Sequence, residues 1–230
     1  MKLYSGPISM FGAKAEVALA EKGLPFVLEL VPYVDGTGYE PRHPEVLRVN
    51  PHKRQVPVLL DGDVQLYDST QIFEYLEHAY PEPPLWPARP ADRAHARLLE
   101  HESDEVFFAQ VIQRMKPRPD DAAHQLARAA RERIAAYHEA AEMRMADGRA
   151  WQAGGFSYAD IAFFLAQLFA AQLGTPVPPD CTRLLDWQRR MQARPAVQPV
   201  AGRIADYFAA RNAASGRSPR SPSSQPITGR

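Results

Sequence analysis

Two places in this sequence put a hydroxyl or carboxylate at the start of a helix, where anions bind. Ser9 stands one residue ahead of a predicted helix that continues to about Lys22, with Gly23 as its stop. Asp68-Ser69 opens a second predicted helix. Backbone N–H groups and the positive end of the helix dipole lower the pKa of an acidic group held at such a position. These residues can therefore hold and stabilise an anion, although each is also an ordinary helix cap.

A third feature is Pro57, which lies within an apolar run from Val56 to Leu60. Proline inside an apparent strand indicates either an edge strand or a cis Val56–Pro57 bond. The cis bond would turn the backbone sharply and leave the N–H and C=O groups of Val56 free to pair with a ligand. A second short run, Val64 to Tyr67, follows Asp61-Gly62, and that dipeptide predicts a type I′ hairpin.

The elements that must position these residues follow in a regular order. Predicted strands at Lys2 to Ser5 and Phe26 to Val31 flank the Ser9 helix, and this spacing implies a βαβ unit with parallel pairing. Residues 1–80 therefore predict β-α-β followed by β-β-α. A linker is expected over residues 81–90, because prolines are too dense there for a helix or a central strand.

Beyond the linker every long segment has a helical pattern, so residues 91–212 predict an all-helical domain. One helix is expected over Ala91 to Lys116, and the charge-free run Ile161 to Leu173 indicates a buried helix. Ser157 and Asp160, just ahead of that run, have the spacing of a capping box. Residues 213–230 are rich in Ser, Pro, Arg and Gly without periodicity, which predicts a disordered tail.

Composition limits the classes of protein that fit. The chain has 230 residues and a formal net charge of zero, so nothing indicates a nucleic-acid partner. A single cysteine, Cys181, excludes a disulfide framework and fits a reducing compartment. No signal peptide, membrane span or metal-binding histidine spacing is recognisable. We therefore expect a soluble cytoplasmic protein with no metal, no nucleic-acid partner and no membrane association.

The motifs and their order resemble those of cytosolic glutathione S-transferases, in particular serine-type, bacterial-like members with a theta-, zeta- or delta-like N-terminal motif. The V-P-V-L string at Val56 is followed by the D-G hairpin and by Asp68-Ser69-Thr70-Gln71-Ile72, where the family usually has E/D-S-x-A-I. Gln71 departs from the usual alanine. The capping motif at Ser157 matches the family string S/T-x-A-D-I. The resemblance covers residues 1 to about 212 and implies a thioredoxin-like domain followed by a helical bundle.

The resemblance implies that glutathione is the co-substrate and that Ser9 activates it. Aligning Lys14 to Gly23 with the first helix of serine-type members places Ser9 on their activating serine. The Ser9 hydroxyl would donate a hydrogen bond to the glutathione thiolate, which is the reactive nucleophile. Ser5 falls on the position of the tyrosine in tyrosine-type members and is the alternative. The cysteine of omega- and beta-like members has no counterpart here, which disfavours cysteine-type redox chemistry.

The resemblance also implies where glutathione binds. Asp68 would take the γ-glutamyl ammonium group and Ser69 the γ-glutamyl carboxylate. Lys53, Arg54 or Gln55 would meet the glycine carboxylate, and the choice among them stays open. Asp104 would reach glutathione from a partner subunit. The residues of this chain implied to bind glutathione are Lys53, Gln55, Val56, Pro57, Asp68 and Ser69.

The expected second substrate is a small hydrophobic electrophile, bound between the first-helix loop and the start of the helical domain. Its expected pocket is lined by apolar side chains: Ile8, Met10, Phe11, Phe107, Phe108 and Met115. The predicted protein is thus a homodimeric detoxifying transferase that adds alkyl or aryl groups to glutathione. The alternatives are a non-catalytic binding or scaffold protein of the same fold, and a specialised glutathione-dependent lyase, isomerase or peroxidase.

Overall fold

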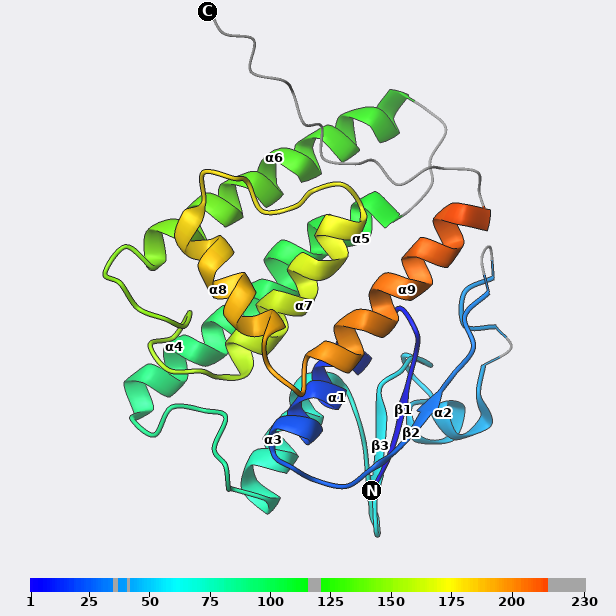
Figure 1. The fold of residues 1–230 in the computed structure, drawn as a ribbon. Coiled ribbons are helices and arrows are strands. Elements are labelled where there is room, and N and C mark those ends of the chain that lie inside the picture. The colour runs from blue at the N-terminus through cyan, green and yellow to red at the C-terminus, as the bar shows by residue number, and fades with distance from the viewer. Residues whose placement is uncertain (35–36, 41, 116–120, 215–230) are drawn as a thin grey trace, which may run out of the picture.

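The computed structural model describes residues 1–34, 37–40, 42–115 and 121–214. Four short strands form one sheet in the order β2-β1-β3-β4 (Figure 1). β1 pairs in parallel with β2, whereas the β1–β3 and β3–β4 pairs are antiparallel. This arrangement confirms the predicted βαβ unit and hairpin. The strands are β1 (Lys2–Ser5), β2 (Val27–Leu30), β3 (Val58–Asp61) and β4 (Val64–Tyr67).

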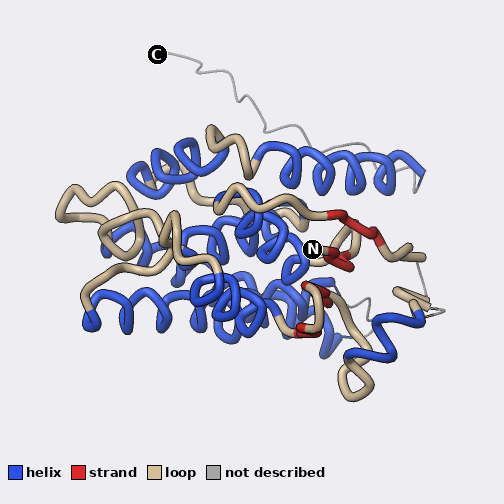
Figure 2. Tube along the Cα trace, turned by 90° about the horizontal axis from the view of Figure 1, so that it is seen from below, coloured by secondary structure: helices blue, strands red, loops and turns tan. Residues whose placement is uncertain are grey.

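The two faces of the sheet carry different packing layers, because successive side chains in a strand point to opposite faces. Leu3 and Leu59 belong to the main core, which also contains residues of α1 (Met10–Glu21) and α3 (Ser69–Ala79). The neighbouring residues Tyr4 and Val58 belong to a smaller cluster with Val46 of α2 (Pro44–Val49). Figure 2 shows the strands gathered at one end of the molecule, beside the helices.

The rest of the chain is a helical domain, as the sequence predicts. Its centre is α7 (Tyr158–Gln172), which packs against α1, α4, η1, α8 and α9. Almost every α7 side chain is buried, because the helix carries no charge after its first turn. The other helical segments are α4 (Pro90–His101), η1 (Glu102–Phe108), α5 (Ala109–Met115), α6 (Asp121–Arg144), α8 (Thr182–Gln192) and α9 (Gln198–Ala214). None of the helices in the described residues is both long and apolar enough to cross a membrane.

Three local expectations need correction. The single helix expected over 91–116 contains a π-helical stretch, η1, between α4 and α5, and residue 116 lies outside the described residues. The hairpin is not type I′, because its central residues are Gly62-Asp63 and only Gly62 has a positive φ, of 56°. Residues 213–214 of the expected tail are the last residues of α9, and the remainder of the tail lies outside the described residues.

Asp160 holds the start of α7 through four hydrogen bonds. One carboxylate oxygen accepts from the Ser157 backbone N–H at 2.9 Å and from the Ser157 hydroxyl at 3.2 Å. The other accepts from the Gln152 N–H and from the Trp187 indole N–H, both at 2.8 Å. Burial raises the pKa of Asp160 to about 6, although the four donors oppose that shift. The predicted S-x-x-D cap is thus also a connection between α7, α8 and the loop before α7.

Candidate functional site

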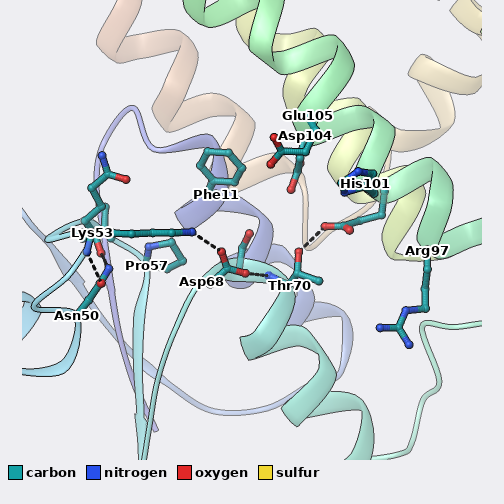
Figure 3. A pocket seen from close by; sticks show the side chains of 14 residues that line it. Phe11, Asn50, Lys53, Pro57, Asp68, Thr70, Arg97, His101, Asp104 and Glu105 are labelled. Atoms are coloured by element: carbon teal, nitrogen blue, oxygen red, sulfur yellow. Dashed lines mark hydrogen bonds and ion pairs between the residues drawn. The ribbon is translucent and has the colours of Figure 1, made fainter.

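A pocket of about 420 Å³ opens between the loop that leads into β3, the start of α3 and the α4–η1 segment (Figure 3). This volume is within the usual range for sites that bind small molecules. The residues that line it from the sheet side are Asn50, Lys53, Gln55, Val56, Pro57, Asp68, Ser69 and Thr70. The residues that line it from α1 and from the α4–η1 segment are Phe11, Arg97, Glu100, His101, Asp104 and Glu105.

The loop before β3 is shaped by Asn50, a residue that the sequence analysis did not single out. Asn50 is 2% exposed, and its amide donates to the Gln55 carbonyl at 2.9 Å while accepting from the Lys53 N–H at 3.0 Å. These bonds close the 50–55 loop and place Lys53 and Gln55 at the pocket. The Val56–Pro57 bond that follows is cis, as predicted, and both residues line the pocket. Arg54 is not among the lining residues.

Asp68 and Ser69 lie together at the first turn of α3. One oxygen of Asp68 accepts from the N–H groups of Thr70 at 3.1 Å and Gln71 at 3.4 Å, so Asp68 is the N-cap. Its other oxygen lies 3.3 Å from the Lys53 ammonium group. Asp68 has a positive φ of 75°, which is uncommon for a residue with a side chain. The helix start thus brings an acceptor, a hydroxyl and several backbone N–H groups to one point.

The helical domain also supports this turn. The Tyr158 hydroxyl, on the first residue of α7, donates to the Ser69 carbonyl at 3.1 Å. The Tyr158 ring stacks on Phe73 of α3, with ring centroids 3.5 Å apart. The Thr70 hydroxyl donates to Glu100 of α4 at 2.8 Å. The position of Ser69 therefore depends on two elements that lie about 30 and 90 residues further along the chain.

A buried ion cluster lies on the side of the pocket that α4 and η1 form. The Lys14 ammonium group is completely buried and lies 2.5 Å from Glu100 and 2.6 Å from Asp104. Burial opposes ionisation of Lys14, but the two carboxylates outweigh it and raise its pKa above the ordinary value. Burial, together with the nearby charge of Glu100, raises the pKa of Asp104 to about 6 against the effect of Lys14. The Lys14 ammonium group thus forms ion pairs with two carboxylates on this side of the pocket.

Ser9 is the N-cap of α1, and its hydroxyl oxygen accepts from the Gly12 N–H at 3.0 Å. It is 9% exposed and is not among the residues that line the pocket, whereas Phe11, two residues later, does line it. Ser5 is completely buried, and its hydroxyl has no hydrogen-bond partner within the described residues. The capping interpretation of Ser9 is therefore confirmed, and its chemical role stays a prediction.

The expected second-substrate pocket needs correction. Phe11 lines the pocket, but four of the other residues are buried in the main core: Ile8, Met10, Phe107 and Phe108. Phe107 packs against Phe163, and Phe108 packs against Phe169, because the η1 segment is covered by α7. The side chain of Met115 lies outside the described residues. Polar residues that the sequence analysis did not choose, among them Thr70 and Glu105, line the pocket instead.

The structure shows the surroundings of Asp104 within its own chain, and its role toward a partner subunit stays a prediction. The sequence analysis assigned it to the glutathione site of a partner subunit. In the structure it lines the pocket of its own chain and is ion-paired to Lys14 of that chain. Only 9% of its side chain is exposed, since η1 packs this residue against α1.

Comparisons with known proteins agree with this geometry. The family model described as the glutathione S-transferase N-terminal domain matches residues 3–84. A stringent starvation protein A homolog of Coxiella burnetii is 34% identical over 110 residues, which are 47% of this chain and 48% of that protein. Glutathione S-transferase U12 of Arabidopsis thaliana is 27% identical over 216 residues, which cover 90% of this chain and 83% of that protein. The matched segment spans about half the length of the curated relatives named stringent starvation protein A homolog.

Solved structures extend the likeness over both parts of the chain. A glutathione S-transferase from Rhodospirillum rubrum F11 has a TM-score of 0.73 and 28% identity, covering 86% of this chain and 90% of that one. The fold and the pocket define a thioredoxin-like sheet joined to a helical domain, with a small-molecule site between them. Residues 3–84 match the N-terminal domain of the glutathione S-transferase family, and the chain as a whole has the fold of that family.

Proposed function

We propose that this protein binds glutathione in the pocket and transfers alkyl or aryl groups to its sulfur. The observation that carries the proposal is the convergence of the cis Val56–Pro57 bond, the capped start of α3 and the 50–55 loop on one pocket. Each supplies a group that an extended tripeptide with charged ends requires: backbone for pairing, a helix start for a carboxylate, and a side chain for the second carboxylate.

The proposed contacts follow the positions of the charges. Asp68 takes the γ-glutamyl ammonium group, and Ser69 with the N–H groups of α3 takes the γ-glutamyl carboxylate. Lys53 and Gln55 both line the pocket and are the candidates for the glycine carboxylate, whereas Arg54 does not line it. Val56 offers its backbone to the peptide groups of glutathione.

In the proposed reaction the glutathione thiol first loses its proton to solvent, and Ser9 stabilises the resulting thiolate. The Ser9 oxygen accepts from the Gly12 N–H, which leaves its own O–H available to donate to sulfur. A sulfur lone pair then forms the new C–S bond, and the leaving group departs from carbon with the former bonding pair. Addition to an activated double bond needs no leaving group, and the carbanion formed is protonated by water.

We also propose a homodimer that uses the outer face of α4 and η1. Two large apolar side chains of these elements are exposed in the single chain, Leu98 of α4 by 51% and Val106 of η1 by 50%, and a dimer interface would cover them.

A second candidate function is glutathione binding without catalysis. The position of Ser9, which caps α1 and is not among the pocket-lining residues, favours this alternative. Among the relatives are several named stringent starvation protein A homolog, a name that specifies no transferase activity.

The test is a calorimetric titration of the protein with reduced glutathione, with ultraviolet absorbance to detect bound thiolate. We expect the wild type to bind glutathione with a thiolate signal near neutral pH, and Ser9→Ala to bind it without that signal. Ser5→Ala is the matched control, because it removes the same hydroxyl from the alternative serine. Binding without a thiolate signal in the wild type would favour the second candidate, and absence of binding at millimolar glutathione would contradict both.

A further inference from the structure

The pocket wall opposite the proposed glutathione-binding residues is polar, in contrast to the apolar wall expected from the sequence. Five residues of α4 and η1 form it: Arg97, Glu100, His101, Asp104 and Glu105. Phe11 contributes one aromatic ring beside them, and the other apolar lining residues, Val56 and Pro57, lie on the glutathione side. Figure 3 shows Asp104 and Glu105 beyond Phe11, across the pocket from Lys53 and Asp68.

The charges on this wall do not balance. Within the described part of the chain, Glu100 and Asp104 share Lys14 as their only cation at hydrogen-bond distance. Glu105 adds a third carboxylate at the pocket. The guanidinium group of Arg97 lies 3.5 Å from Glu74 of α3 and is directed to that partner. The wall therefore presents an excess of negative charge to anything bound in the pocket.

One acceptor on this wall has no partner in the described residues. The Oδ2 atom of Asp104 binds Lys14, but the Oδ1 atom is buried and has no hydrogen bond. The Asp104 side chain is nine-tenths buried, so water reaches it poorly. A buried carboxylate oxygen without a donor is unfavourable, and a ligand with a cationic N–H group would satisfy it.

We propose that this wall is the co-substrate subsite and that it selects an electrophile carrying a primary ammonium or similar cationic N–H group near the reacting carbon. The inference rests on the proposed function, because it assumes that glutathione occupies the opposite side of the pocket. Asp104 and Glu105 bind the cationic group, and Phe11 covers the short carbon segment between that group and sulfur. A purely apolar electrophile would leave the Oδ1 atom of Asp104 without a donor and would take water away from Glu105 without replacing it by a polar group.

Two synthetic thioethers test this selectivity without knowledge of the natural electrophile. S-(2-aminoethyl)glutathione and S-propylglutathione have nearly the same size and differ by an ammonium group in place of a methyl group. Each is titrated calorimetrically into the wild type, Glu105→Gln and Asp104→Asn, beside reduced glutathione. Glu132→Gln is the matched control, because Glu132 is an exposed residue of α6 that pairs with Arg128 away from the pocket.

We expect the wild type and Glu132→Gln to bind the aminoethyl thioether about tenfold more tightly than the propyl thioether, as a charge-assisted hydrogen bond predicts. Glu105→Gln and Asp104→Asn should each reduce this ratio to about threefold or less, with reduced glutathione bound as in the wild type. Glu105 is exposed, so its variant tests the proposal even where Asp104→Asn does not fold.

Three outcomes would overturn the inference. Equal binding of the two thioethers by the wild type would show that the wall does not select a cation, while the proposed glutathione site would stand. Glu105→Gln could also weaken the binding of reduced glutathione as much as that of the aminoethyl thioether. That result would assign the wall to the γ-glutamyl ammonium group instead. Absence of binding of all three compounds would overturn the proposed function together with this inference.

Discussion

Replacing Asp160 by alanine is the sharpest test of how the helical domain is held together. The carboxylate is completely buried and accepts from two backbone N–H groups, one indole N–H and one hydroxyl. Alanine offers no acceptor.

The size of the effect follows from the donors that lose their partner. The Gln152 and Ser157 N–H groups and the Trp187 indole belong to residues no more than 1% exposed. Leaving a buried donor unsatisfied costs about 1–3 kcal/mol, whereas the Ser157 hydroxyl can rotate to another acceptor. Three such donors give a loss of about 3–9 kcal/mol in the free energy of unfolding. That is a large fraction of the roughly 5–15 kcal/mol typical of a folded protein.

Urea unfolding at pH 7, followed by tryptophan fluorescence, measures this difference because Trp187 is one of the bonded groups. Asp180→Ala is the matched control, since Asp180 is an exposed aspartate in the loop before α8. We expect that control to stay within about 0.5 kcal/mol of the wild type. A loss below about 1 kcal/mol in Asp160→Ala, with an unchanged m-value, would refute the reasoning, because the donors would then have found other partners.

Two further predictions concern one pair of glycines, in α1 and α9, and one histidine in α6. A Cβ atom at Gly12 would overlap the Ser5 hydroxyl, so Gly12→Ala should lower stability by about 1–3 kcal/mol. A Cβ atom at Gly202 meets nothing within 4 Å, so Gly202→Ala should raise the stability by about 0.5–1 kcal/mol. Thermal melting compares the two variants, and a higher melting temperature for Gly12→Ala than for Gly202→Ala would contradict this packing. Burial lowers the pKa of His138 to about 4, so the folded protein excludes a proton that the unfolded chain binds near pH 6.5. Between pH 6.5 and 4, the free energy of unfolding should therefore fall by about 3 kcal/mol more in the wild type than in His138→Leu. Urea unfolding at a series of pH values measures this difference, and an equal fall in the two proteins would contradict the prediction.

The parts of the fold that depend on neighbouring residues could be predicted from the sequence. The order of the elements along the first 80 residues and the Asp68 cap are encoded within segments of a few residues, whereas the cis Val56–Pro57 bond was one of two alternatives for that proline. The same is true of the Ser157–Asp160 cap, where the acceptor stands three residues from its backbone donor. Turns and helix caps depend on a few adjacent residues, so they can be predicted without knowledge of the tertiary structure.

The lining of the pocket could not be predicted in the same way. An apolar residue near an expected cleft has the same sequence pattern whether it lines the cleft or lies in the core. Phe107 and Phe108 are in the core because α7 covers η1, and that packing is a tertiary property. The π-helical stretch also changes the direction of each side chain in this segment relative to the regular helix that was expected.

Lys14 shows a second limit of sequence reasoning. A lysine in a helix usually indicates a solvent-exposed position, yet the Lys14 side chain is completely buried. Its partners, Glu100 and Asp104, stand 86 and 90 residues away, so no local pattern connects them. Only the tertiary structure brings Lys14, Glu100 and Asp104 together, so the polar wall of the pocket could not be predicted from the sequence.

The hydrogen bond from Tyr158 to the Ser69 carbonyl has a consequence for how this architecture can be recombined. The side chains proposed to contact glutathione precede residue 70, but the turn that aims them is fastened by a tyrosine of the helical domain and, through Thr70, by a glutamate of α4. A chimera that grafts residues 1–84 onto the helical half of a relative without these two groups would inherit the ligands and not their alignment. A chimera between relatives must therefore keep the contacts between the two halves of the chain. An exchange of domains made at the linker alone would lose these hydrogen bonds.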